Sequence, residues 1–107
     1  MKVTFCKPDF EKLAYDPVFV GRWTWDIKQR YQKAIVAFDI IKRRESLFPL
    51  SGMNFELLAG KRKRHRKKEY DREYSVRLNR RFRVVFAFDG PSEDETIIIV
   101  DIEDYHK

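Results

Sequence analysis

The stretch that decides the fold is residues 73–88, which read EYSVRLNRRFRVVFAF. In each half, apolar side chains alternate with others, which is the pattern of a strand with one buried face. The apolar positions are Tyr74, Val76 and Leu78 in the first half, and Phe82, Val84, Phe86 and Phe88 in the second. The connection Asn79-Arg80-Arg81 has the length of a three-residue hairpin loop. The sequence therefore predicts an antiparallel hairpin.

The register of this hairpin brings two arginines together. If the apolar faces coincide, Leu78 lies opposite Phe82 and Arg77 lies opposite Arg83. Like charges directly opposite each other repel, so the arrangement needs a compensating partner. Either an anionic ligand binds between the two arginines, or both point into water or pair with an acidic strand.

Three further strands are predicted by the same reasoning. Residues 1–6 (MKVTFC) and 53–59 (MNFELLA) predict short strands. Residues 96–102 (TIIIVDI) are typical of a central strand that is covered on both faces. With two helices after the first strand, the order β-α-α-β-β-β-β predicts an α+β domain, with helices on one face of a mostly antiparallel sheet.

Two helices are expected between the first two strands. The first begins at Pro8, a residue that suits the first turn of a helix, and reaches about Asp16. For the second, Asp26 is a suitable N-cap and completes a capping-box pattern with Gln29. This helix is expected to end before residues 48–49 (Phe-Pro), and its basic residues, Lys28 among them, fall largely outside its apolar stripe.

Length and composition predict one folded domain spanning residues 1–107, because 43% of the residues are hydrophobic and 15% are aromatic. The single cysteine, Cys6, cannot form an internal disulfide and is expected to be a small buried residue of the first strand. The N-terminal residues lack the apolar run of a signal peptide, and no stretch approaches the length of a membrane span. A soluble cytoplasmic protein without membrane attachment is expected.

Positive charge is concentrated in one part of the chain. The formal net charge is +6, but residues 61–83 alone hold twelve Lys or Arg against three Asp or Glu. The basic run, residues 61–68 (KRKRHRKK), begins with Lys61, Arg62, Lys63 and Arg64. Such a run either attracts a polyanion such as RNA or is a solvated loop.

Arg and Lys residues together with a terminal Asp104-Tyr105-His106 could cleave RNA without a metal. Two histidines and one cysteine, all distant in sequence, have no metal-ligand spacing, and no cofactor motif is present, so neither a metal nor a cofactor is expected. Cleavage through the 2′-OH needs a base, cations for the phosphorane charge, and an acid for the leaving oxygen. Histidine as a residue type suits proton transfer near neutral pH, which makes His106 the candidate, although a residue one position from the end is often frayed.

The chain resembles the HigB-type toxins of the RelE/ParE superfamily of bacterial toxin–antitoxin systems over nearly its whole length. The segments that carry the resemblance are FEKLAYDPVFVG (10–21), MNFELLAG (53–60), YSVRLNRRFRVVFAF (74–88) and VDIEDYHK (100–107). The resemblance implies a RelE-like, microbial-ribonuclease-type α+β fold. It further implies an endoribonuclease (an mRNA interferase) that cuts mRNA in the ribosomal A site of the bacterial cytoplasm. A cognate helix-turn-helix antitoxin would neutralise it.

Position by position, the resemblance assigns the site. His106 is the leading acid/base, Tyr105 orients or stacks on the substrate, and Asp104 precedes them. Arg77 and Arg83 would contact phosphate. Glu56 stands where some relatives carry a second histidine, so it either serves as the base or leaves the site weakened.

The basic run is extra relative to the family and is expected to dock on ribosomal RNA. Two other functions stay open: a ParE-like poison of DNA gyrase, and a catalytically weakened module that binds RNA or an antitoxin.

Overall fold

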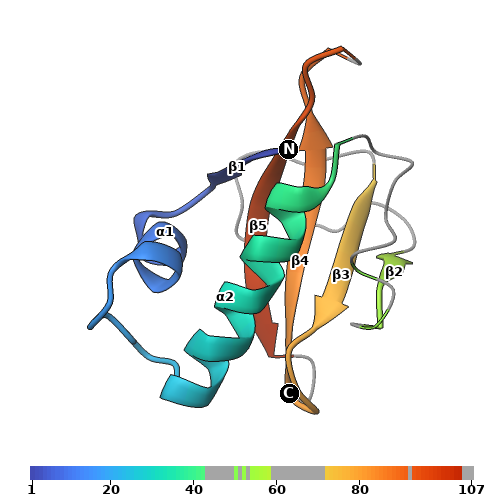
Figure 1. Ribbon diagram of the computed structural model, residues 1–107. Coiled ribbons are helices and arrows are strands. Elements are labelled where there is room, and N and C mark those ends of the chain that lie inside the picture. The colour runs from blue at the N-terminus through green and yellow to red at the C-terminus, as the bar shows by residue number, and fades with distance from the viewer. Residues whose placement is uncertain (43–49, 51, 53, 59–71, 92, 105–107) are drawn as a thin grey trace.

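Two helices and five strands make up the described part of the chain (Figure 1). The computed structural model describes residues 1–42, 50, 52, 54–58, 72–91 and 93–104. The elements in chain order are β1 (Lys2–Phe5), α1 (Pro8–Tyr15), α2 (Trp25–Ile40), β2 (Glu56–Leu58), β3 (Glu73–Arg77), β4 (Phe82–Asp89) and β5 (Thr96–Asp104). The predicted order and the α+β class are confirmed.

The strands form one mixed sheet with the order β1-β5-β4-β3-β2. The first strand pairs with β5 in parallel, and the remaining neighbours pair antiparallel. The strand β5 is internal, as its run of Ile and Val predicted. Figure 1 shows α2 lying across one face of the sheet and α1 beside the β1 edge.

The β3–β4 hairpin has the predicted register. Arg77 lies opposite Arg83, and the Leu78 amide donates to the Phe82 carbonyl at 2.9 Å. The side chain of Asn79 stabilises the turn, because its Oδ1 accepts from the amides of Arg81 and Phe82, both at 2.8 Å. An asparagine that bonds the backbone two or three residues ahead favours a tight turn.

The core lies between α2 and the sheet face that carries the alternating apolar residues of the hairpin. Its centre is aromatic: the Phe38 ring of α2 lies 4.6 Å from Phe86, which in turn lies 5.7 Å from Tyr74. Tyr31 is fully buried and donates its hydroxyl hydrogen to the Phe10 carbonyl at 2.8 Å, so α2 is tied to α1. The buried face of α2 contains the apolar residues that recur at spacings of three and four, namely Ile27, Tyr31, Ala34, Ile35 and Phe38, together with Lys28 and Ala37.

The start of α2 differs from the prediction. The N-cap is Thr24, whose Oγ1 accepts from the Ile27 amide at 3.2 Å. Asp26 already belongs to the first turn, where it forms an ion pair with Arg30 at 3.0 Å. Both residue types are good caps, and the extended backbone at Thr24 selects the earlier one. The helix ends at Ile40, and residues 43–49 lie outside the described residues.

Two side chains are placed differently from what the sequence suggested. Cys6 is exposed, because β1 ends one residue earlier, at Phe5. Lys28 is buried, with 2% of its surface exposed. Its ammonium group donates to the carbonyls of Leu13 (2.9 Å), Asp16 (2.6 Å) and Phe19 (2.8 Å). The first two belong to the C-terminal end of α1, where helix carbonyls lack partners within the helix.

A bulge in β5 determines which side chains face the core. Phe86 pairs with Ile99 but Val85 pairs with Asp101, so Val100 is an extra residue. Ile97 and Ile99 belong to the core before the bulge, and Ile102 belongs to it after the bulge. The bulge therefore moves Glu103 to the face that carries Arg83, which lies directly opposite it.

Candidate functional site at the end of β5

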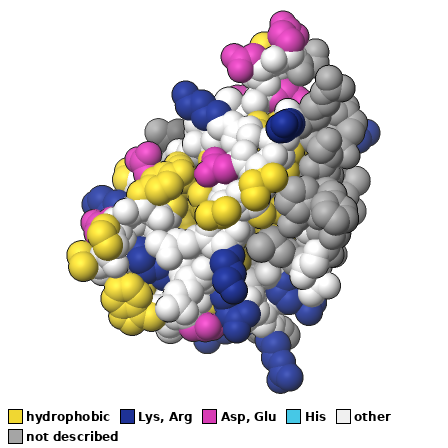
Figure 2. Space-filling view, in the orientation of Figure 1, with side chains coloured by type: hydrophobic (Ala, Val, Ile, Leu, Met, Phe, Trp, Pro, Cys, Tyr) yellow, Lys and Arg dark blue, Asp and Glu magenta, His cyan; other side chains and the backbone are white. Residues whose placement is uncertain are grey.

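Three of the predicted site residues come together at one end of the sheet. Arg77 pairs with Arg83 across β3 and β4, and Asp104 pairs with Phe82 across β5 and β4. The β3–β4 turn and the end of β5 are therefore neighbours (Figure 1). Figure 2 shows Lys and Arg side chains at this same end of the molecule. The structure thus joins the predicted phosphate-binding arginines to the strand that leads into the C-terminal tail.

The other predicted residues are not placed. His106 and Tyr105, together with the basic-run residues Lys61, Arg62, Lys63 and Arg64, lie outside the described residues. For Glu56 only the backbone is described: it begins β2 and pairs with Ser75. Ser75 is two residues from Arg77, so the backbone of Glu56 lies on a strand next to the arginine pair but not at its level.

Arg83 is held by an ion pair with Glu103. Its Nη2 donates to Oε1 of Glu103 at 2.5 Å, and its Nε donates to the same oxygen at 3.0 Å. The Glu103 side chain is only 4% exposed and that of Arg83 is 17% exposed. The sequence left open whether the hairpin arginines bind an anion, point into water or pair with an acidic strand. Arg83 pairs with an acidic residue of β5. The pair compensates the like charges of the hairpin within the sheet itself.

Arg77 differs from Arg83 in exposure. It is the exposed residue of β3, whose other members are buried. The two arginines lie directly opposite each other on neighbouring strands. Arg83 is the more buried of the two, and Arg77 is the more exposed. Arg77 is therefore the more accessible to a phosphate in solution.

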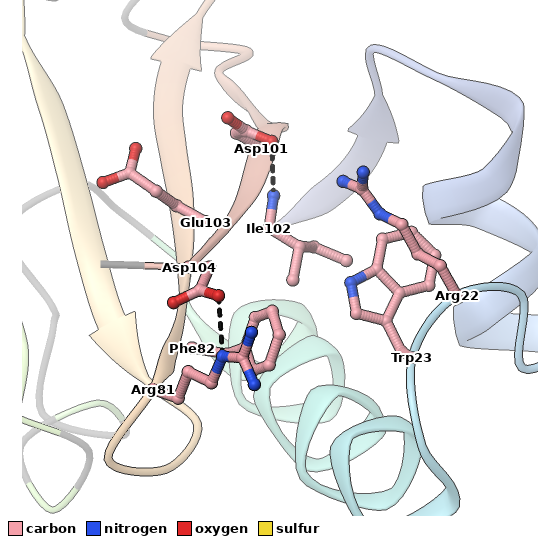
Figure 3. Close-up of a pocket in the computed structure, with 8 residues that line it drawn as sticks. All are labelled: Arg22, Trp23, Arg81, Phe82, Asp101, Ile102, Glu103 and Asp104. Carbon is pink, nitrogen blue, oxygen red and sulfur yellow. Dashed lines mark hydrogen bonds and ion pairs between the residues drawn. The ribbon is translucent and has the colours of Figure 1, made fainter. Parts of the chain in front are cut away.

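A pocket of about 320 Å³ lies beside the end of β5. Figure 3 shows Arg22 and Trp23, from the segment before α2, on one wall and the β5 residues on the other. The pairing of β1 with β5 runs from Thr96 to Ile99 on β5, so the pocket lies along the part of β5 beyond it. An opening at this place follows from the short length of β1.

The polar groups of this pocket carry both signs of charge. Arg81 donates through Nε to Oδ2 of Asp104 at 2.6 Å. The Oδ1 of Asp101 accepts from the Ile102 amide at 2.9 Å. The guanidinium carbon of Arg22 lies 5.1 Å from the centre of the Trp23 ring, within the range of a cation–π contact. The lining of the pocket therefore contains both hydrogen-bond donors and acceptors.

The described residues contain no group of three or more His, Cys, Asp or Glu side chains placed to hold a metal ion. Within the same ranges, no helix is both long enough and apolar enough to span a membrane. Comparison of the chain with known protein families, curated proteins and solved structures gave no match.

Several residues of this end of the sheet were not anticipated from the sequence. Glu103 was missed because only the bulge at Val100 places it opposite Arg83. Arg81 and Arg22 lie in segments that the sequence predicts to be loops, so they gave no indication of a site. The one available signal was the order of charges in residues 101–104, where three acidic residues follow the apolar run and could have been matched with the hairpin arginines.

Proposed function

We propose that the protein is a HigB-type toxin with a RelE-like fold, acting as a ribosome-dependent mRNA endoribonuclease. The observation that carries the proposal is the register of β3, β4 and β5, in which Arg77, Arg83 and Glu103 follow one another across the sheet. This row lies one residue before Asp104, from which the chain continues into Tyr105 and His106. Arginines beside the strand that leads to an acid/base tail support the chemistry that the sequence favours.

The proposed reaction uses these residues in distinct roles. The 2′-oxygen attacks the adjacent phosphorus, the bond to the 5′-oxygen breaks, and a cyclic phosphate remains. Glu56 acts as the base and takes the proton of the 2′-OH. His106 acts as the acid and gives a proton to the leaving 5′-oxygen. Arg77 stabilises the negative charge that develops on the non-bridging oxygens of the phosphate. Arg83 would contact the phosphate only by exchanging its ion pair with Glu103 for it.

Partners follow from the same proposal. The substrate is mRNA in the ribosomal A site, and the basic run at residues 61–68 would dock on ribosomal RNA. Neutralisation by a helix-turn-helix antitoxin would complete the system.

The decisive experiment is primer extension on mRNA after induced expression in a bacterium. We expect translation arrest and new 5′ ends within codons for the parent protein, and neither for His106→Ala. The matched control is His65→Ala, since the chain contains only these two histidines. Circular dichroism of both purified variants checks that each is folded. Unchanged toxicity of a folded His106→Ala variant would exclude the tail from the chemistry.

The same assay separates the other two functions. DNA damage with intact mRNA would select the gyrase poison. Salt-sensitive RNA binding without cleavage on ribosomes would select the non-catalytic binding module, with Glu56 unable to replace a histidine.

A further inference from the structure

The pocket beside β5 contains a buried hydrogen-bond donor without an acceptor. Trp23 is 8% exposed, and its Nε1 has no hydrogen-bond partner in the described parts of the chain. In Figure 3 this nitrogen lies on the side of the indole that faces Ile102 and Phe82, and so points into the pocket. A buried N–H group without a partner is unfavourable, because its bond to water is not replaced. An acceptor that enters the pocket would remove this cost.

The mouth of the pocket presents flat cationic groups stacked on aromatic rings. The Arg22 guanidinium lies over Trp23, and that of Arg81 lies 5.4 Å from the centre of the Phe82 ring. Both arginines are exposed. Proteins hold unpaired RNA bases between such planar groups, aromatic rings and guanidinium planes alike.

The charges of the pocket define the kind of ligand that it suits. Asp104 is paired with Arg81 and Glu103 is paired with Arg83, so the other two charged residues of the lining are Arg22 on one wall and Asp101 on the other. A bare phosphate would meet the carboxylate of Asp101, and a simple cation would meet Arg22. The complementary ligand is small and planar, with an acceptor and a donor on one edge. The volume of about 320 Å³ is at the low end for ligand pockets and accommodates one base.

We propose that this pocket binds a single unpaired nucleobase of the RNA substrate, an inference that rests on the proposed function. The carbonyl oxygen of the base accepts from Nε1 of Trp23, and its amino or imino hydrogens are donated to Asp101. Guanine carries a carbonyl oxygen next to two such donor groups, and is the base that matches the pocket best. Since Asp104 lines the pocket and leads into Tyr105 and His106, the bound base selects which phosphate is presented for cleavage.

The test follows the indole N–H of Trp23 directly. The chain has two tryptophans, so a ¹H–¹⁵N spectrum shows two indole signals, and Trp25→Phe assigns them. The protein is the full chain carrying His106→Ala, which permits its expression. It is titrated with guanosine 5′-monophosphate and, separately, with ribose 5-phosphate, which lacks the base. We expect the Trp23 signal to move downfield and saturate with the nucleotide but not with the sugar phosphate, while the Trp25 signal stays in place.

Two variants test the assigned contacts. Asp101→Asn is expected to raise the dissociation constant of the nucleotide about ten-fold, the effect of one lost charge-assisted hydrogen bond. Arg22→Gln removes the guanidinium group over Trp23 and is expected to raise it as well. Lys33→Gln, an exposed residue on α2, removes a charge elsewhere and is expected to change nothing. A Trp23 signal that is unmoved by the nucleotide, or moved equally by ribose 5-phosphate, would overturn the proposal.

The titration involves no catalysis, so it separates this inference from the proposed function. Base binding together with an absence of mRNA cleavage would count against the proposed function alone. Cleavage of mRNA by a protein whose Trp23 signal does not respond would count against the pocket alone.

Discussion

At the residue scale, Lys28 joins the two helices through its buried ammonium group. Three backbone carbonyls accept from it, two of them from the end of α1. A hydrophobic side chain of similar length would fill the space and leave these carbonyls without a donor. A buried polar group that loses its hydrogen-bond partner lowers the stability of the folded protein. Lys28 is therefore a structural residue, although its type and its position in the sequence suggest a solvated one.

We expect Lys28→Met to lower the free energy of unfolding by about 3 kcal/mol, since three charge-assisted hydrogen bonds are lost from a buried site. Lys33→Met on the same helix is the matched control, because Lys33 is exposed, and it should change stability by less than about 0.5 kcal/mol. Urea unfolding measures both. Equal stabilities of the two variants would show that the contacts of Lys28 are not stabilising.

Tyr31 makes stability depend on pH in the alkaline range. Burial raises the pKa of Tyr31 above its ordinary value of 10.0, and Tyr15 adds a smaller contribution in the same direction. Above pH 10 the unfolded chain loses the phenolic proton while the folded protein keeps it. Stability from this group is therefore complete below pH 10 and decreases as the pH rises beyond it.

We expect Tyr31→Phe to flatten this alkaline loss of stability. At neutral pH the variant should be less stable by about 1 kcal/mol, because the hydrogen bond to the Phe10 carbonyl is gone. Urea unfolding measured at intervals from pH 7 upward gives both quantities. The same alkaline slope in parent and variant would assign the effect to another group.

At the element scale, the bulge in β5 and the short β1 strand shape the candidate site. The bulge at Val100 aligns Glu103 with Arg83, and the end of the β1 pairing at Ile99 leaves room for the pocket. The run of Ile and Val in residues 96–102 predicts a strand but gives no sign of the extra residue. A one-residue change of register exchanges the two faces of a strand, so these local details decide which charges meet.

The Arg83–Glu103 ion pair links β4 to β5. Removal of the arginine should lower stability, because the carboxylate of Glu103 stays buried. We expect Arg83→Ala to lower the free energy of unfolding by about 3 kcal/mol, because Glu103 would be left buried without its cation. The double variant Arg83→Met with Glu103→Leu should recover most of this loss. A double-mutant cycle by urea unfolding measures the coupling. An Arg83→Ala variant as stable as the parent would contradict the pairing.

Because substitution of Arg83 is expected to destabilise the fold, Arg77 is a better position than Arg83 for testing contact with phosphate. Because Arg77 is exposed, we expect Arg77→Ala to have a smaller effect on folding than Arg83→Ala, in which any loss of the proposed activity would be mixed with instability.

At the scale of the whole molecule, the charge distribution separates binding from chemistry. The net charge of +6 arises from residues 61–83, which join the basic run to the hairpin arginines, while the rest of the chain is net acidic. Long-range attraction of a polyanion is thereby directed to one part of the protein. The basic run at residues 61–68 is the most conspicuous feature of the sequence. Under the proposed function it docks on ribosomal RNA and takes no part in the cleavage reaction.

We expect replacement of four basic-run residues by serine to reduce the salt dependence of RNA binding. The residues are Lys61, Arg62, Lys63 and Arg64. If all four contact phosphates, the slope of log K against log salt concentration becomes shallower by about 3, close to 0.7 per contact for single strands. The matched control replaces four exposed lysines elsewhere, namely Lys2, Lys12, Lys33 and Lys42. Equal slopes for the two variants would mean that the basic run does not contact RNA.

The sequence by itself determined the element order, the α+β class and the hairpin register. These depend on local alternation and helical periodicity, which the chain carries in neighbouring residues such as Tyr74, Val76 and Leu78. The hairpin register also brought Arg77 and Arg83 together, and the resemblance to the HigB-type toxins pointed to Asp104.

Only the tertiary structure decided the partners of these residues. The burial of Lys28, the cap at Thr24, the pairing of Arg83 with Glu103 and the unmatched N–H of Trp23 each involve contacts or backbone conformations that no local pattern encodes. Lys28 meets carbonyls nine to fifteen residues away, and Glu103 meets an arginine twenty residues away. Such contacts depend on how the helices pack and on one extra residue in a strand. The energies of packing and register act across the whole fold, whereas periodicity reports only which face of each element is buried.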